Sequence, residues 1–169
     1  MITAEYVRTM AAYNRAMNQR LYDAAARLSD TERRQDRGAF WSSIHGTFNH
    51  LLWGDRMWMS RFASWPTPEL GLKQSAELVQ DFDTLRADRE AADRDIYAWA
   101  EQVSDDWLTG DLSWFSGLAG REVSAPRASM VLHMFNHQTH HRGQAHAMLT
   151  AAGQQTGDTD IWLVLGRRR

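Results

Sequence analysis

Apolar residues recur along most of the chain at the three- and four-residue spacing that places them on one face of an α-helix. This pattern predicts four helices, over Thr3 to Leu28, Ser42 or Ser43 to Phe62, Leu78 to Val103, and Pro126 to Ala152. Pro66, Pro68 and Gly71 mark Ser64 to Leu72 as a linker. Four amphipathic helices without a sustained strand pattern predict an all-α fold, most simply a four-helix bundle.

The segment before the last predicted helix has a different pattern. Between Asp111 and Val123 the helical spacing is lost, and a Ser-Gly-Leu-Ala-Gly run at residues 116–120 is typical of a turn. We therefore expect a short hairpin-like insertion before the last helix, which would begin at Pro126 and stop at Gly153.

One charged residue, Arg89, interrupts the apolar face of the third predicted helix. A buried arginine needs a carboxylate or carbonyl partner, and Asp55 and Asp93 are the nearest candidates by residue type. The alternative is that the side chain extends along the helix to reach solvent. The sequence leaves both arrangements open.

Length and composition limit the classes of protein. A chain of 169 residues with 43% hydrophobic residues suits a single domain, 1–169. A net charge of −2 argues against nucleic-acid and anionic-membrane partners, and the absence of cysteine excludes disulfides and thiolate ligands from this chain. No stretch approaches the roughly 20 apolar residues that cross a bilayer, so we expect a cytoplasmic protein. The Arg167–Arg169 end is expected to be a solvated tail.

Chemistry-bearing residues gather on the last predicted helix. At 100° per residue they share one inward-turned face, whereas His146 lies opposite and is expected at the surface. The residues of this face are His133, His137, His140, His141 and Gln144. His137 and His141 have the i, i+4 spacing with which a helix offers two imidazoles to one metal ion.

A third ligand must come from another helix. His45 and His50 are five residues apart and project about 140° apart, so they cannot both reach one ion. We favour His50, because Gly46 and Gly54 lie one turn away on each side and would leave room for an ion and a substrate.

Three neutral imidazoles without a fourth protein ligand are typical of a catalytic site with an open coordination position. Such a set suits zinc or nickel, with iron or cobalt as alternatives. Gln138 follows His137, which excludes the His-Glu-x-x-His motif of metalloproteases, and no carboxylate is predicted on this face. His133 and His140 are expected to support the ligands or to lie at the rim of the site, and not to bind the ion themselves. The alternative is that the histidines are ordinary surface or core residues.

Several passages together resemble the DinB/YfiT-like family of metalloenzymes. They are Tyr13-Asn14 with Asn18, the run Ser43 to His50 with Asp55, the segment Trp107 to Pro126, and Asn136-His137-Gln138-Thr139-His140-His141-Arg142-Gly143-Gln144. The resemblance implies an up-down-down-up four-helix bundle, a divalent ion held by His50, His137 and His141, and frequent dimerisation. The resemblance also implies thiol chemistry, because the family's characterised members include transferases and isomerases that use low-molecular-weight thiols.

We therefore expect a thiol-dependent S-transferase or isomerase that acts on a small electrophile, with a low-molecular-weight thiol as partner. Asn14, Asn18 and Gln144 would orient the substrate, because amides form hydrogen bonds but do not titrate near neutrality. The alternatives are a hydrolase that uses metal-bound hydroxide, and a non-catalytic, stress-related metal-binding bundle. Eight tryptophans and eight methionines are more apolar surface than a small core hides, which favours a homodimer.

Overall fold

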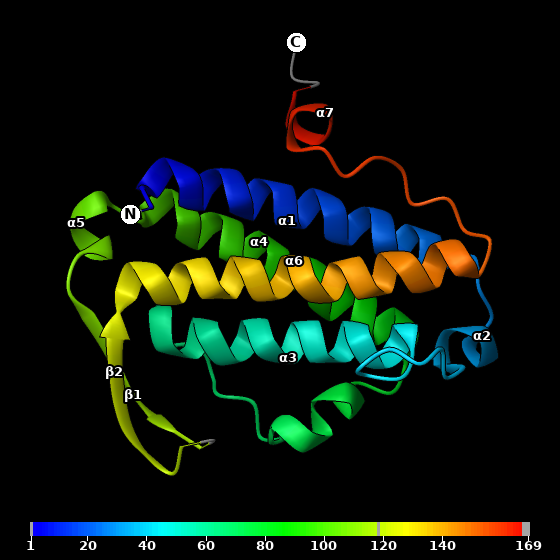
Figure 1. Ribbon diagram of the computed structural model, residues 1–169, viewed down its shortest axis with the longest axis horizontal. Helices are drawn as coiled ribbons and strands as arrows, with labels where there is room; N and C mark the ends of the chain where they lie inside the picture. The colour runs from blue at the N-terminus through cyan, green and yellow to red at the C-terminus, as the bar shows by residue number, and fades with distance from the viewer. Residues whose placement is uncertain (1, 118, 167–169) are drawn as a thin grey trace.

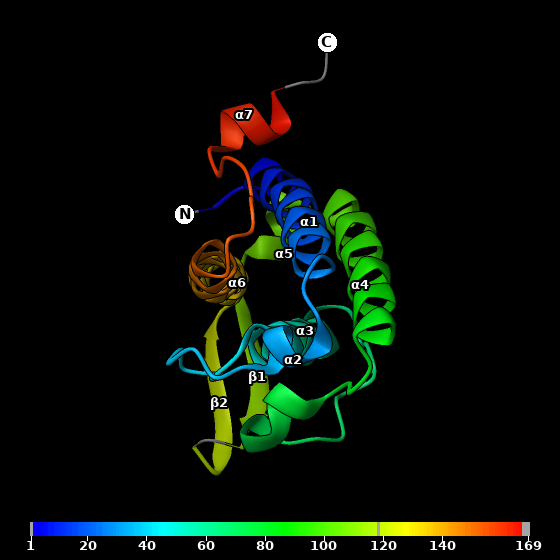
Figure 2. The same ribbon diagram turned by 90° about the vertical axis from the view of Figure 1, so that its right-hand side faces the viewer.

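The computed structural model describes residues 2–117 and 119–166; the predicted Arg167–Arg169 tail and Leu118 in the predicted turn lie outside them. The described chain is mostly helical, with one two-stranded antiparallel sheet. Its long helices lie alongside one another in Figure 1, and they are α1 (Ala4–Ala25), α3 (Ile44–Phe62), α4 (Phe82–Gln102) and α6 (Arg127–Ala151). Helices α1 and α3 each pack against both α4 and α6, as the turned view in Figure 2 shows.

Side-chain caps decide where three of these helices begin. Thr3, Ser43 and Asp81 each accept a hydrogen bond from a backbone N–H in the first turn of α1, α3 and α4. The predicted start of the third helix at Leu78 is therefore wrong, because the chain becomes α-helical only after Asp81. Pro126 immediately precedes α6, and Gly153 follows it with a φ of +77° that ends the helix.

Several short elements join the long helices. They are α2 (Asp30–Arg34), the 3₁₀ helix η1 (Leu72–Glu77), α5 (Asp105–Leu108) and α7 (Ile161–Leu165). None of these was expected from the apolar pattern, because each is too short to show a helical repeat. Ser29 and Glu32 form a capping box at the start of α2, so α1 ends at Ala25 instead of Leu28.

The expected hairpin is confirmed. Strands β1 (Asp111–Ser116) and β2 (Arg121–Pro126) pair antiparallel, with Trp114 opposite Val123. Trp114 is half-buried and its ring contacts Trp58 of α3, whereas the neighbouring Phe115 is 62% exposed. The hairpin therefore places one aromatic side chain against the end of α3.

Two apolar clusters fill the interior, one toward each end of the long helices. The first contains Leu21, Phe48, Leu85 and Leu149, and the second contains Val7, Met59, Ile96 and Phe135. Among the described residues, no helix has both the length and the apolar content to cross a membrane. The helices instead bury these faces against one another.

A buried polar layer separates the two clusters. Arg89 Nη1 lies 2.5 Å from Asp55 Oδ2, and Arg89 Nη2 lies 2.9 Å from Asp93 Oδ1. Asn18 Nδ2 donates to Asp93, Asn14 Nδ2 donates to Gln138 Oε1, and Gln138 Nε2 donates to Asp55 Oδ1. These six residues are all buried and join α1, α3, α4 and α6.

The layer confirms the predicted buried partners of Arg89, and the alternative in which Arg89 reaches solvent is wrong. Burial by itself would lower the pKa of Arg89, but the carboxylates of Asp93 and Asp55 outweigh it and hold the pKa above its ordinary value. The guanidinium therefore stays charged inside the protein.

Replacing Arg89 by methionine is expected to lower the free energy of unfolding by about 3–5 kcal/mol, because two carboxylates would be left buried without their counter-charge. Urea denaturation measures the change. The matched control is Arg86→Met on the same helix, which removes partly exposed ion pairs with Asp23 and Glu90 and is expected to cost at most about 1 kcal/mol. A loss below about 0.5 kcal/mol for Arg89→Met would contradict the structural role of the layer.

Candidate metal centre

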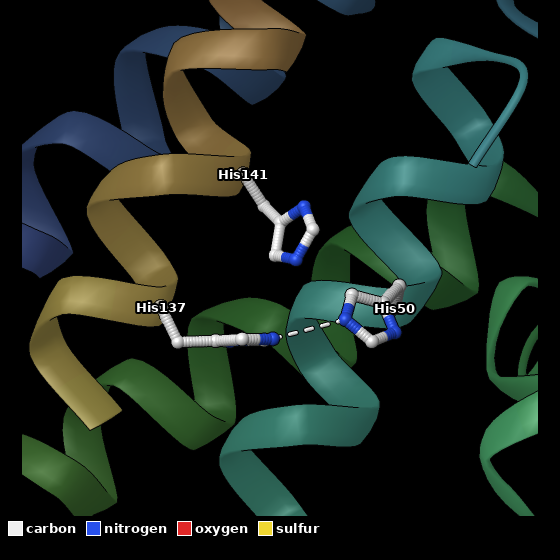
Figure 3. A group of neighbouring side chains, drawn as sticks. All are labelled: His50, His137 and His141. Atoms are coloured by element: carbon white, nitrogen blue, oxygen red, sulfur yellow. Dashed lines mark hydrogen bonds between the residues drawn. The ribbon is translucent and has the colours of Figure 1, made fainter. Parts of the chain in front are cut away.

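Three histidine side chains from two helices point toward one another (Figure 3). His50 comes from α3, and His137 and His141 come from successive turns of α6. One ring nitrogen from each lies within 4.8 Å of those of the other two, and the Nε2 atoms of His50 and His137 are 3.0 Å apart. The structure therefore brings together the three residues that the helical angles selected.

Hydrogen bonds to Nδ1 orient two of the rings. His50 Nδ1 lies 2.8 Å from the Oγ of Ser75, a buried residue of η1. His141 Nδ1 lies 2.7 Å from Gln144 Oε1, one turn along α6, and donates to it in the Nδ1–H tautomer. A ring held through Nδ1 offers Nε2 to an ion, which is the arrangement that supports histidine ligands in metal sites.

A glycine makes room for the third ring. A Cβ atom built on Gly54 of α3 would lie only 3.0 Å from Cε1 of His137. The expectation that Gly54 leaves space for an ion and a substrate is thus wrong, because the His137 ring itself occupies that space. A Cβ on Gly46 would lie 2.5 Å from the Trp41 carbonyl oxygen, so Gly46 accommodates the chain before α3.

Trp41 covers one side of the histidine group. Its ring stacks on His50 with 4.1 Å between centroids and 23° between planes. The backbone turns sharply after it, since Ser42 has a φ of +60°, a conformation that is uncommon for a residue other than glycine. Trp41 therefore reaches His50 from an irregular loop in which no helical or strand repeat could place it.

The surroundings keep the rings neutral. Burial, followed by the neighbouring rings of His137 and His141, lowers the pKa of His50 to about 3. Burial, followed by the charges of the nearby histidines, lowers the pKa of His137 to about 4, and burial also lowers the pKa of His141. At neutral pH the three rings are uncharged, so each has one ring nitrogen with a free lone pair for an ion.

None of the other histidines, which all lie in the described part of the chain, contributes a ring nitrogen to this group. His45 is buried, and its Nε2 lies 3.0 Å from the Val79 carbonyl oxygen. His133 and His140 are exposed, with ring centroids 6.0 Å from that of His137 and 4.8 Å from that of His141, respectively. The expected surface position of His146 is wrong, because this residue is half-buried with Nε2 3.1 Å from Thr156 Oγ1.

Asn14, Asn18 and Asp55 belong to the buried polar layer behind the histidines. Gln138, which immediately follows His137, binds Asn14 and Asp55 there. Sequence reasoning selected Asn14, Asn18 and Asp55 but used Gln138 only to exclude a motif. Its position, about 100° from His137 on the helix, was the available signal that it faces the core.

Arg142 is a second buried residue of α6 that sequence reasoning missed. Its guanidinium lies 5.6 Å from the centroid of the Tyr13 ring. Burial lowers the pKa of Arg142 to about 10, although Asp55 and Tyr13 partly oppose this effect. Arg142 therefore packs in the interior beside the polar layer, one position after His141.

The donor set fits a divalent metal ion. Four nitrogen ligands placed 2.0–2.1 Å from a zinc ion in a tetrahedron lie roughly 3.3 Å apart, close to the 3.0 Å between the His50 and His137 nitrogens. Two unprotonated nitrogens this close repel each other unless a proton or an ion lies between them. Among the residues described, the group includes no carboxylate, so a bound ion would have a coordination position for a small ligand.

Comparison with known proteins agrees with the geometry. The family model described as DinB family matches residues 1–166, nearly the whole chain, and the chain belongs to this family. Neither a curated protein nor a solved structure matches the sequence. The resemblance found in the sequence is thereby confirmed at the level of the family.

Gly54→Ala tests the arrangement without removing a ligand. The added methyl group is expected to displace the His137 ring and to weaken zinc binding by about tenfold, as other changes to groups that orient ligands do. A competition titration with a zinc chelator measures the affinity. Gly143→Ala is the control, since a Cβ there meets no atom within 4 Å. Equal affinity in Gly54→Ala and the unaltered protein would show that this close contact is unimportant.

Proposed function

We propose that this DinB-family chain is a divalent-metal-dependent enzyme in which His50, His137 and His141 hold the ion. Its reaction is the transfer of a low-molecular-weight thiol to a small electrophile, or an isomerisation that depends on such a thiol. The observation that carries the proposal is the set of three neutral ring nitrogens within 4.8 Å of one another, with no carboxylate in the group among the described residues. Such a set favours catalytic over structural metal binding.

A divalent ion bound there would lower the pKa of a thiol or water molecule in the open position and make it nucleophilic at neutral pH. Three imidazoles suit zinc or nickel, and iron or cobalt fit the same donors. No cysteine of this chain competes with a thiol from solution, because the sequence contains none.

The residues around the histidines have separate tasks in this proposal. His133 and His140 are exposed imidazoles beside the ligands, and they would accept and release the proton of the incoming thiol. Gln144 holds His141 through Nδ1 and can contact substrate through its amide nitrogen. Trp41 excludes water from one side of His50.

The proposal includes the architecture and assembly of the protein. The four long helices form an up-down-down-up bundle in one domain, 1–169; in support, one apolar cluster joins the start of α1 and α6 to the end of α3 and α4. A homodimer, a cytoplasmic location and a role in stress remain predictions from the sequence and the family resemblance. The apolar side chains of Phe40, Phe115 and Trp162 are each more than 60% exposed, in three separate segments of the chain.

The first test concerns the ligands. Protein purified without an affinity tag is expected to carry about one divalent ion per chain by elemental analysis. Replacing His50, His137 or His141 by alanine is expected to remove most of it, because two imidazoles seldom retain an ion. His146→Ala is the control, since that ring contacts Thr156 instead. Full occupancy in His50→Ala would refute the ligand assignment.

The second test concerns the reaction. Metal-loaded protein is offered a panel of electrophiles with bacillithiol, mycothiol, glutathione or water as acceptor, and product formation is measured. Turnover that requires a thiol is expected, and Gln144→Ala is expected to reduce it by about 10- to 100-fold through the loss of His141 orientation. Turnover with water alone would establish the hydrolase alternative. No turnover, together with a lower melting temperature after metal removal, would establish a structural role.

A further inference from the structure

A row of side chains continues from the histidine group toward the hairpin. On α3, Gly54, Trp58 and Arg61 follow one another at helical spacings of four and three, so they lie on one face. On the facing side of α6, the ring of His133 lies 6.0 Å from that of His137 and 5.2 Å from that of Trp58. The metal centre, His133 and Trp58 therefore form a continuous series of ring contacts.

Arg61 ends this row between two aromatic faces. Its guanidinium carbon lies 4.4 Å from the centroid of the Trp58 ring and 5.2 Å from that of Trp114. Strand β1 supplies Trp114, whose ring meets Trp58 edge to face at 5.9 Å. The hairpin thus holds a charged group in a fixed position at the end of α3.

The charge of Arg61 has no partner of opposite sign within the described part of the chain. The arginines that do contact carboxylates there are Arg33, Arg34, Arg56, Arg86 and Arg89. Arg61 is only half-exposed, and burial lowers its pKa without an opposing carboxylate. A half-buried guanidinium with unused donors is suited to a carboxylate that arrives with a ligand, which it can bind through two parallel hydrogen bonds.

The distance along α3 limits the size of that ligand. Gly54 contacts the His137 ring, and the seven positions from Gly54 to Arg61 rise about 10 Å. A peptide-like chain of three residues has about the same extended length. We propose that Arg61, framed by Trp58 and Trp114, binds the distal carboxylate of a thiol of about this length whose sulfur lies at His50, His137 and His141.

This inference rests on the proposed thiol chemistry and adds the recognition of the thiol. Trp58 and His133 cover the middle of the bound molecule with ring faces, whereas Arg61 selects its charged end. Arg61 is thus a residue that determines specificity and positions the thiol. It contacts neither the metal ligands nor the sulfur.

The test uses cobalt-loaded protein, in which a thiolate that reaches the ion produces a charge-transfer absorption band. Glutathione, which carries two carboxylates, and its diethyl ester, which carries none, are titrated separately against this band. The unaltered protein is expected to bind glutathione about tenfold more tightly than the ester, the effect of one charge-assisted hydrogen-bonded pair. Arg61→Met is expected to abolish this preference while cobalt content stays unchanged.

Two further variants distinguish recognition from a change in fold. Arg61→Lys keeps the charge but loses the paired geometry, and it is expected to show an intermediate preference for glutathione. Arg56→Met, on the same helix, removes an ion pair with Asp88 and is expected to retain the full preference.

The outcomes separate the two proposals. If Arg61→Met still prefers glutathione as strongly as the unaltered protein does, the role of Arg61 is refuted and the thiol chemistry stands. If no thiol produces the absorption band in the unaltered protein, the thiol chemistry fails, and the proposed role of Arg61 fails with it.

Discussion

The ion pairs of Arg89 are the interaction on which the rest of the structure depends. One guanidinium binds Asp55 of α3 and Asp93 of its own helix, and amides of Asn18 and Gln138 extend the contacts to α1 and α6. Apolar side chains tolerate small shifts between helices, but hydrogen bonds to buried charges do not. The polar layer therefore fixes the position of each long helix along the axes of its neighbours.

The histidine group depends on that alignment. Asp55 immediately follows Gly54 on α3, and Gln138 immediately follows His137 on α6. Since neighbouring residues point about 100° apart on a helix, each pair places one residue in the polar layer and one in the histidine group. A displacement of α3 along α6 would break the bond between Gln138 and Asp55 and would also move the His137 ring away from Gly54. Stability and site geometry thus depend on the same contacts.

The sequence predicted the parts of this arrangement that helical repetition controls. The four long helices, the shared face of His137 and His141, the nearness of His50 to both and the buried partners of Arg89 all follow from spacing and residue type. These predictions succeeded because residues on one helix have fixed relative directions.

Contacts that depend on loops or on a second helix could not be predicted in the same way. Trp41 and Ser75 reach His50 from segments with no long repeat, and the close contact of Gly54 with His137 depends on the distance between two helices. The start of α4 was misplaced because Leu78 continues the apolar spacing, although Asp81 supplies the cap. Periodicity describes a single helix, whereas these features depend on how several segments pack.

The distribution of charge explains why such a centre would favour an anionic ligand. Its three histidines are neutral, and Asp55, the carboxylate that α3 carries next to Gly54, is already paired with Arg89. The charge of Asp55 therefore interacts with Arg89 inside the polar layer and does not neutralise a divalent ion on the other side of Gly54. A thiolate would supply the missing negative charge at the ion, and a distal carboxylate would do the same at Arg61. The buried ion pairs thus leave the charge of the open site to be balanced by what binds there.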